Sequence, residues 1–325
     1  MNYGSPQALR TALEHRLFTT SRETGIALDR LRRRVLFERI VTRLQFAEPG
    51  LWVLKGGMAL EVRLSDAARL TKDIDVGLRD VILDAADLHE RLIDALSGDS
   101  FEDRFVLEVS EPAALREDGG GHLTWRVSVA ATLAGKHFGA IKLDVSPRAH
   151  ELHATDRLPL PNSLAFAGIS TTDVEIIDVH RHAAEKFHAM TRDFGDRENS
   201  RVRDLLDLVI LIENDQLSPG PVADSAREVW AERDGADPPR QLPPLPVSWP
   251  ARYVLLAGGY DVEARTLPAS SLTRAEPVAP DVPEREEAIV AAQRKTSGAS
   301  SSQAKLGAVT KPVLRTPLTT RATAL

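Results

Sequence analysis

Residues 51–60, Leu-Trp-Val-Leu-Lys-Gly-Gly-Met-Ala-Leu, and residues 69–76, Arg-Leu-Thr-Lys-Asp-Ile-Asp-Val, decide how this chain folds. The first segment predicts an apolar strand that ends at a glycine pair and leads into a short helix. The second predicts a strand with a side-chain period of two, so that Asp73 and Asp75 project from one face while Ile74 enters the core. We expect the rest of the fold to be arranged around this acid pair and glycine turn.

The residue types in these two segments suit the binding of a divalent cation and a phosphate. Mg²⁺ prefers carboxylate oxygens together with the oxygens of a nucleotide's phosphates. Because Gly56 and Gly57 lack Cβ atoms, the backbone there can approach a phosphate closely. The N–H groups at the start of the following helix would point at the same anion. We therefore expect a nucleotide and a metal ion to meet at this turn, with Asp73 and Asp75 as metal ligands.

A third carboxylate, Asp144, stands in a later segment of alternating apolar and polar residues, 138–145. The alternation predicts a strand with Asp144 on its polar face, where it could join the acid pair. Three such acids could hold metal ions that clamp the attacking and leaving oxygens of a phosphoryl displacement. Asp144 could instead be a solvated residue balanced by Lys142, and the pattern leaves both interpretations open.

The composition excludes several classes of site. The chain has 325 residues, enough for two domains, and it has no cysteine, so disulfides and thiolate metal sites are excluded. Its formal net charge is −6, yet residues 294–325 carry six basic side chains and no acidic one, so any nucleic acid must bind a local patch. No apolar run reaches the length of a membrane span and no signal-peptide core is present. We therefore expect a soluble, cytoplasmic protein.

Helical periodicity precedes the central unit. Residues 6–46 predict two helices, and the second is rich in arginine. These arginines could form a solvated face with acidic partners, or they could contact a phosphate backbone. They are Arg30, Arg32, Arg33, Arg34, Arg39 and Arg43.

The rest of the chain mixes strands and helices and ends in a segment poor in large apolar residues. Residues beyond about 267 predict disorder, apart from a helix at 284–293. The other expected elements are helices at 83–96, 174–190 and 201–212, strands at 105–109 and 123–131 that form a hairpin, and a proline-rich strap at 242–249 before a short helix.

Four motifs follow one another along the chain: Leu54-Lys-Gly-Gly-Met-Ala-Leu60, Arg69-Leu-Thr-Lys-Asp-Ile-Asp75, Glu185-Lys-Phe-His-Ala189 and Arg201-Val-Arg-Asp-Leu-Leu-Asp-Leu208. In this combination the chain resembles the AbiEii/AbiGii nucleotidyltransferase toxins, a family that includes the MenT toxins, over roughly residues 28–256. The resemblance implies an α+β fold, in which a DNA-polymerase-β-like nucleotidyltransferase domain carries N-terminal helices and a helical C-terminal lobe. It also implies the toxin half of a toxin–antitoxin or phage-defence system.

Carried over position by position, the resemblance assigns roles and boundaries. The expected boundaries are an N-terminal helical segment at 1–48, a nucleotidyltransferase core at 49–165, a helical lobe at 166–266 and a disordered tail at 267–325. The substrate would be a nucleoside triphosphate and the cofactor Mg²⁺ or Mn²⁺. The catalytic set would be Asp73, Asp75, Asp144, Lys186, Asp204 and Asp207, with Asp73, Asp75 and Asp144 as metal ligands. The nucleotide-binding set would be Lys55, Gly56, Gly57, Arg69, Thr71, Lys72, Lys186 and Arg203.

Some of these positions also have plain structural interpretations. Lys186 could form a helix salt bridge with a nearby acid, and Arg203 and Asp207 could pair four residues apart on one helix face. Many nucleotidyltransferases of this fold have Gly-Ser where this chain has Gly56-Gly57, so the backbone N–H groups would have to bind the phosphate without a serine hydroxyl. Three histidines are interpreted as packing or capping residues: His180, His182 and His188.

The resemblance implies a toxin that transfers a nucleotide to RNA, with the 3′ acceptor end of a tRNA as the expected target and a cognate antitoxin as a partner. Two other interpretations stay open at this stage. The acceptor could be a small molecule such as an aminoglycoside, or a protein hydroxyl group. The chain could also bind a nucleotide or a partner protein without turnover.

Overall fold

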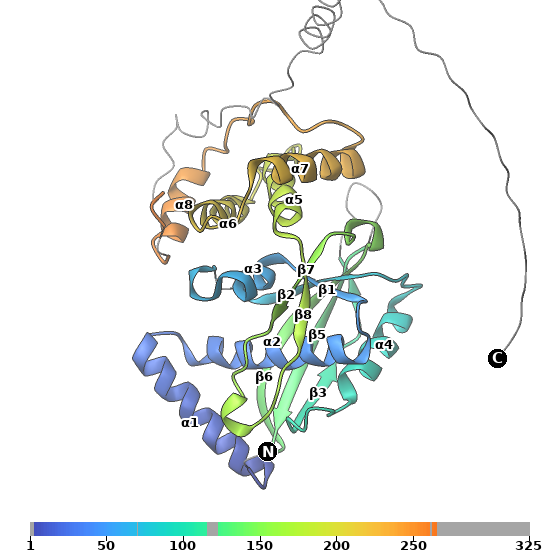
Figure 1. Cartoon of the computed structure of the whole chain (residues 1–325), viewed down its shortest axis with the longest axis vertical. Helices are drawn as coiled ribbons and strands as arrows, with labels where there is room; N and C mark the ends of the chain where they lie inside the picture. The colour runs from blue at the N-terminus through green and yellow to red at the C-terminus, as the bar shows by residue number, and fades with distance from the viewer. Residues whose placement is uncertain (1–2, 70, 116–122, 261, 265–325) are drawn as a thin grey trace, which may run out of the picture. The chain divides into compact units, whose positions relative to one another are not determined.

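The computed structural model describes residues 3–69, 71–115, 123–260 and 262–264, which all lie in one compact unit, Met1–Val278. They form an α+β fold, a mixed sheet flanked by helices (Figure 1). The predicted disorder of residues 267–325 and the predicted helix at 284–293 concern residues outside the described part of the chain. The helices are α1 (Pro6–Thr24), α2 (Leu28–Ala47), α3 (Gly56–Leu64), α4 (Ala85–Ser97), α5 (Val179–Thr191), α6 (Val202–Glu213), α7 (Pro219–Asp234) and α8 (Trp249–Ala257). Three short 3₁₀ helices, Ser65–Ala67, Ala149–Glu151 and Ala165–Ala167, complete them.

The sheet has the strand order β3-β5-β6-β2-β1-β8-β7, with β4 paired to β5. Strand β2 lies between two partners, antiparallel to β1 and parallel to β6, and β8 runs parallel to β1 on its other side. This order brings strands from distant parts of the chain to the centre of the sheet. The strands are β1 (Trp52–Lys55), β2 (Asp73–Leu78), β3 (Phe105–Val109), β4 (Ala113–Ala114), β5 (Trp125–Leu133), β6 (Lys136–Pro147), β7 (Thr155–Pro159) and β8 (Asp173–Ile177).

The predicted central unit is confirmed. Strand β1 ends at Lys55, α3 begins at Gly56, and β2 begins at Asp73. Ile74 and Val76 are buried in the core, whereas the intervening Asp75 is only half-buried. The period of two therefore sorts the apolar and acidic side chains of β2 onto opposite faces, as expected. The hairpin of residues 105–109 with 123–131 is also confirmed, because β3 pairs antiparallel with β5.

The prediction of one helix over residues 174–190 is wrong in its first part. Residues 173–177 form strand β8, which pairs with β1 and β7, so the sheet extends past residue 165. The helix α5 begins only at Val179, where the Asp178 carboxylate accepts hydrogen bonds from the backbone N–H groups of His180 and Arg181, both at 2.9 Å. The β-branched residues of this segment fit a strand once a partner strand is available.

The helices at the C-terminal end of the described chain form their own apolar cluster. Helix α5 packs on α6 and α7, and α6 packs on α8 (Figure 1). The cluster is centred on Trp249 and Tyr253 of α8, which pack with Leu206 and Ile210 of α6. The short helix expected after the proline-rich strap is thus confirmed as α8. No helix among the described residues is long and apolar enough to cross a membrane.

The arginine-rich helix, α2, uses most of its arginines inside the protein. Arg39 and Arg43 are buried, and Arg43 donates a hydrogen bond to the Asp103 carboxylate at 2.6 Å. Two further arginines are held by glutamates of neighbouring helices, in the ion pairs Arg32–Glu14 at 2.8 Å and Arg34–Glu61 at 3.1 Å. Four of the six arginines are therefore engaged within the fold, which favours the structural interpretation over contact with a phosphate backbone.

Glu38, on the same helix, makes stability depend on pH. Its carboxylate accepts hydrogen bonds at 2.7 Å from the backbone N–H and from the hydroxyl of Ser163. Burial nevertheless raises the pKa of Glu38 to about 7. An unfolded glutamate loses its proton near its ordinary value of 4.5, so the folded state binds more protons between pH 4.5 and 7. Stability should therefore fall as the pH rises through this window.

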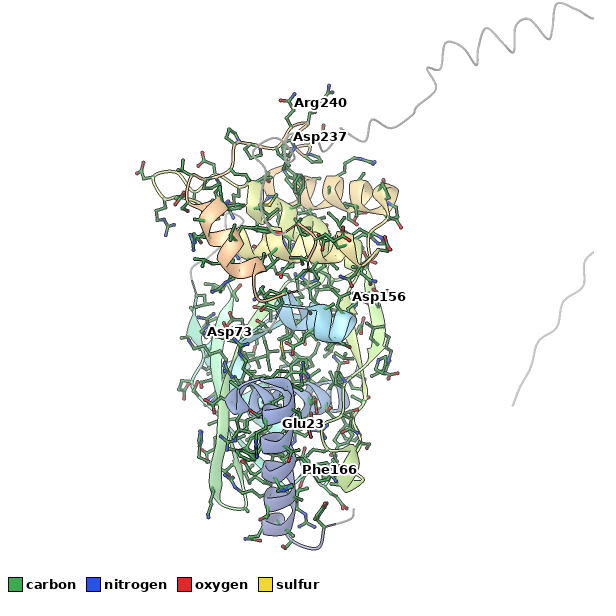
Figure 2. The ribbon with its side chains drawn as sticks, turned by 90° about the vertical axis from the view of Figure 1, so that its left-hand side faces the viewer. Glu23, Asp73, Asp156, Phe166, Asp237 and Arg240 are labelled. Atoms are coloured by element: carbon green, nitrogen blue, oxygen red, sulfur yellow. The ribbon has the colours of Figure 1, made fainter. Side chains whose placement is uncertain are left out.

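We expect Glu38→Gln to remove this component, which amounts to about 3 kcal/mol above pH 7 if each pKa unit is worth about 1.4 kcal/mol. The free energy of unfolding in urea, measured between pH 4.5 and 8, should decline less steeply in the variant. Glu23→Gln is the control, because Glu23 is an exposed residue of α1, labelled in Figure 2. If wild type and Glu38→Gln lost stability in parallel across this range, the assignment would be wrong.

Candidate active site

The glycine turn between β1 and α3 fits tightly against the acids of β2. Gly56 has a φ of +61°, a left-handed conformation that favours glycine. A Cβ atom at Gly56 would lie 1.9 Å from Asp75 Oδ2, and one at Gly57 would lie 2.8 Å from Thr71 Cβ. Glycine is therefore required at both positions, because Asp75 and Thr71 lie too close to leave room for a Cβ atom. The carboxylate of Asp75 lies directly against the turn. The predicted convergence of acids and turn is present.

A threonine hydroxyl lies beside the turn, close to where a serine hydroxyl at position 57 would be. A Cβ atom at Gly57 would lie 3.0 Å from Thr71 Oγ1, so the threonine hydroxyl occupies space that a serine side chain at position 57 would use. Arg69 Nη2 would lie 3.4 Å from the same Cβ position. Thr71 and Arg69, both expected at the nucleotide, thus stand beside the first turn of α3. The N–H groups of that turn have no partner within the helix.

The parallel pairing of β2 with β6 places the third acid beside the pair. Asp144 is in register with Asp75, and Lys142 is in register with Asp73. Burial raises the pKa of Asp75 to about 6, and the negative charges of Asp144 and Asp73 add to the rise. Lys186 opposes it but does not cancel it. The free protein therefore holds repelling carboxylates that a cation would stabilise.

Arg126 forms an ion pair with the third acid, Asp144. It stands opposite Asp144 on β5 and donates two hydrogen bonds, from Nε to Oδ1 at 2.7 Å and from Nη2 to Oδ2 at 2.6 Å. Asp144 is thus buried and balanced by an arginine, not by Lys142, whose side chain is exposed. A bidentate arginine takes the carboxylate oxygens that a metal ion would need.

The donor set fits a hard divalent cation at Asp73 and Asp75. Both offer carboxylate oxygens from one face of β2, and their mutual repulsion would be relieved by a cation. In the described part of the chain, no three acidic, histidine or cysteine side chains are arranged as a metal site. Asp144 is paired with Arg126, so it would have to leave that pair before it could join the other two acids at a metal ion.

We expect Arg126→Met to increase the affinity for Mn²⁺ about tenfold, because one lost charge-assisted pair is worth about 1.4 kcal/mol or more. Methionine keeps the apolar contacts of the arginine stem and removes the competing cation. Isothermal titration of Mn²⁺ at constant ionic strength gives the measurement. Arg157→Met, which removes an exposed cation from β7, is the control for net charge. Equal affinities in the two variants would contradict a competition between Arg126 and the metal.

Lys186, from α5, lies in a buried cluster with two acids of α6. Its Nζ donates to Asp207 Oδ2 at 2.7 Å and to Asp204 Oδ1 at 3.1 Å. Burial lowers the pKa of Lys186, but the attraction of Asp207 and Asp204 outweighs it and the net shift is upward. Asp207 Oδ1 also accepts a hydrogen bond from Arg69 Nε at 3.0 Å. Lys186 is therefore charged and held in place, and Asp207 positions two cations together.

The alternative interpretation, in which Arg203 pairs with Asp207 on one face of α6, does not hold in the described part of the chain. Asp207 is fully buried and turned toward Lys186 and Arg69, whereas the side chain of Arg203 is exposed. Packing of α6 on α5 favours this orientation, because α5 supplies the buried cation Lys186 to the buried carboxylate. Asp204 and Asp207 do act as a pair at spacing three, through their shared contact with Lys186.

Lys55 is held in a network that ties the sheet to the C-terminal helices. Its Nζ donates to Glu151 at 3.2 Å and to Glu185 of α5 at 3.1 Å. Arg233 of α7 contacts the same two carboxylates, at 3.1 and 3.2 Å. Burial raises the pKa of Glu151, but Lys55 and Arg233 outweigh it and bring that pKa to about 2. Lys55, expected at the nucleotide, therefore has a structural role in the free protein.

These groups line one cleft of about 1140 Å³ between the sheet and the C-terminal helices. Asp73, labelled in Figure 2, lies on its sheet wall. Among the predicted site residues, Lys72 is exposed and outside the cleft lining, and Asp207 lies behind Lys186. The predicted residues that line the cleft are Lys55, Gly56, Gly57, Arg69, Thr71, Asp73, Asp75, Asp144, Lys186, Arg203 and Asp204.

The cleft also contains Arg126, which the sequence did not single out, and His182, which was interpreted as a packing or capping residue. Arg126 could have been suspected from its place in an alternating strand, but its partner depends on the strand register. His182 lines the cleft, and its pKa lies well below the ordinary value because of burial and the nearby Lys186 and Lys55, so the imidazole is neutral. His188 bonds to Asp234 at 2.8 Å, which agrees with a packing role.

Comparison with known proteins gives one family and several solved structures. The family described as "Nucleotidyl transferase AbiEii toxin, Type IV TA system" matches residues 39–288. The chain is similar to MenT4, a nucleotidyltransferase toxin from Mycobacterium tuberculosis H37Rv, with 18% identity, a TM-score of 0.47, and coverage of 82% of this chain and 84% of that chain. It is also similar to a proposed nucleotidyltransferase from H. pylori, with 15% identity, a TM-score of 0.42, and coverage of 76% and 91%. The curated protein sequences contain no match.

Proposed function

Since the chain belongs to the family of AbiEii nucleotidyl transferase toxins of type IV toxin–antitoxin systems, we propose that it transfers a nucleotide from a nucleoside triphosphate to RNA in a Mg²⁺-dependent reaction. The expected acceptor is the 3′ end of a tRNA. A nucleotidyltransferase activity and a toxin role follow from the family itself. The metal, the RNA acceptor and a function in phage defence are the proposed part, and a cognate antitoxin is the proposed protein partner.

The contact between Gly56 and Asp75 carries this proposal. It places a carboxylate against the start of a helix, where free N–H groups attract the phosphates of a nucleotide. Asp73 and Asp75 would hold Mg²⁺, which when bound withdraws charge from the triphosphate and lowers the pKa of the attacking hydroxyl. Thr71 and Arg69 stand beside the same turn and would contact the triphosphate. Lys186 would add a positive charge from the facing helix.

These positions support the following transfer step. The 3′ oxygen of the acceptor forms a bond to the α-phosphorus, the bond to the β-phosphate oxygen breaks, and pyrophosphate leaves. Asp144 would accept the hydroxyl proton after Arg126 has released it. Asp207 does not contact the substrate in this scheme. It keeps Lys186 and Arg69 side by side, and it is therefore a positioning residue.

The charge of the cleft supports a polyanionic acceptor. Nine basic and six acidic side chains line it, a net charge of +3 in a chain whose total is −6. An aminoglycoside is a cation and would gain nothing from this surface, whereas a nucleic acid would be attracted to it. A protein hydroxyl needs no such charge. The RNA acceptor is therefore favoured over both alternatives.

Incubation of the protein with each labelled nucleoside triphosphate, Mg²⁺ and either total RNA or purified tRNA tests the proposal. Label should appear at the 3′ end of the RNA and should be absent when EDTA is present. Parallel reactions with an aminoglycoside and with a total protein extract test the other acceptors. Binding of a nucleotide without transfer to any of these acceptors would contradict the proposal and favour a binding module.

A further inference from the structure

Three arginines on the helical wall of the cleft have no partner for their side chains among the described residues. Arg197 lies in the loop between α5 and α6, Arg203 in the first turn of α6, and Arg252 on α8. All three are exposed, and no side-chain hydrogen bond or ion pair within the described chain engages them. They differ in this from Lys186 and Arg69, whose charges are compensated by buried aspartates.

The loop that carries Arg197 is held firmly by its neighbours. The Asn199 side chain donates hydrogen bonds to the carbonyl groups of Ala189, Met190 and Arg192, at 3.2, 2.8 and 3.1 Å. The Asn199 carbonyl in turn accepts a hydrogen bond from Nε1 of Trp249 at 2.7 Å. The indole of Trp249 is fully buried. The arginines are therefore presented by a fixed frame of α5, α6 and α8.

Apolar surface accompanies these charges. Phe194 lines the same part of the cleft and is half-buried, and Leu255 of α8 is 83% exposed. Arginines beside an aromatic ring are the combination that single-stranded nucleic acids require, because the cations contact phosphates while bases stack on the ring. The three acids on this wall are already engaged, Glu185 by Lys55, Glu198 by Ser248 and Asp204 by Lys186. They do not pair with the three arginines.

We infer that this wall, formed by Arg197, Arg203, Arg252 and Phe194, holds the single-stranded end of the acceptor RNA. The inference rests on the proposed function and adds the side of the cleft on which the acceptor lies. The glycine turn and the acids on the sheet wall already provide for one triphosphate. The three arginines come from separate elements and are additional to these groups. They are therefore suited to bind successive phosphates of an RNA strand and not the same triphosphate. Phe194 stacks on a base near the 3′ end.

The test uses a fluorescein-labelled single-stranded RNA of twelve nucleotides and measures binding without nucleoside triphosphate. The triple variant Arg197→Gln, Arg203→Gln, Arg252→Gln should weaken binding at least about tenfold. Each phosphate contact contributes about 0.7 to the slope of log K against log salt for single strands, so the slope should become shallower by about 2. Phe194→Leu should weaken binding about tenfold and leave the salt slope unchanged.

The matched control is Arg22→Gln, Arg30→Gln, Arg157→Gln, which removes three exposed arginines from α1, α2 and β7. We expect its RNA affinity and salt slope to stay close to wild type. Equal losses in the two triple variants would overturn the inference, because they would show a general charge effect. A cleft variant that lost nucleotide affinity in calorimetry but kept RNA affinity would also overturn it, since the arginines would then serve the triphosphate.

The inference and the proposed function can fail separately. If wild type transfers nucleotide to RNA and the cleft variant shows an unchanged KM for RNA, the function holds and the inference is wrong. If wild type binds RNA through these arginines but transfers no nucleotide, the proposed transfer is wrong. Thermal unfolding of each variant checks the fold, and the single substitutions Arg197→Gln and Arg252→Gln repeat the test if the triple variant is unstable.

Discussion

Asp75→Asn is expected to abolish nucleotide transfer and, in the same protein, to increase stability. The carboxylate of Asp75 lies against the glycine turn and beside two other acids, so we expect it to be the ligand that joins a metal ion to a triphosphate. A metal contributes several kcal/mol to phosphoryl transfer, so the rate should fall by about 10³ or more. Asparagine has the same shape and lacks the charge that the metal needs.

The stability of this variant should move in the opposite direction. Burial and the repulsion of Asp144 and Asp73 raise the pKa of Asp75 to about 6, so its charged form destabilises the free protein at neutral pH. Removal of the charge should increase the free energy of unfolding by up to about 3 kcal/mol at pH 7.5 in the absence of metal. Single-turnover transfer assays and urea unfolding give the two measurements.

Asp237→Asn is the control for Asp75→Asn, because Asp237 is exposed and is labelled in Figure 2 far along the chain from β2. It should leave both activity and stability unchanged. Retained transfer in Asp75→Asn would remove this residue from the catalytic centre. A loss of activity accompanied by a loss of stability would instead indicate a structural role for the carboxylate.

Gly56→Ala should have the second largest effect. The new Cβ would lie 1.9 Å from Asp75 Oδ2 and 2.8 Å from Asp75 Cβ, so the acid itself would have to move. A displacement of about 1 Å at a reacting centre can cost 10² in rate. The left-handed φ of +61° adds a conformational cost of about 1–2 kcal/mol. We therefore expect at least about a hundredfold loss of transfer together with a clear loss of stability.

Gly135→Ala separates these two causes. Gly135 also has a positive φ, +68°, but a Cβ atom there would meet nothing within 4 Å. It should cost about 1 kcal/mol of stability from backbone strain and leave transfer intact. Transfer rates and thermal unfolding of both variants make the comparison. Equal activity in the two alanine variants would mean that the contact between Gly56 and Asp75 does not matter for the reaction.

The local part of this site could be predicted because short-range rules decide it. The alternation Asp73-Ile74-Asp75-Val76 sets which side chains enter the core, and a glycine pair after an apolar strand predicts a tight turn. Both features hold in the structure. The order of the central elements followed from the same patterns, and the α+β class followed from the family resemblance.

The remainder depends on contacts between distant segments. Residues 173–177 are too few for their sequence to distinguish a helix from a strand. They form a strand because they pair with β1. Arg126 faces Asp144 only because the β5–β6 hairpin has one particular register, which shifts between Ala131 and Thr132. Asp207 turns inward because α6 packs on α5, a fact that spacing along one helix cannot reveal.

The position of Lys55 between Glu151 and Glu185 has a consequence for how such chains can diverge. Lys55 immediately precedes the glycine turn, and Glu185 immediately precedes Lys186. The ion pair between Lys55 and Glu185 therefore fixes the distance between the glycine turn and Lys186. An exchange of one residue alone would leave the buried charges of this network unbalanced. In homologous chains we therefore expect positions 55, 151, 185 and 233 to change together or not at all, a coevolving quartet rather than four independent sites.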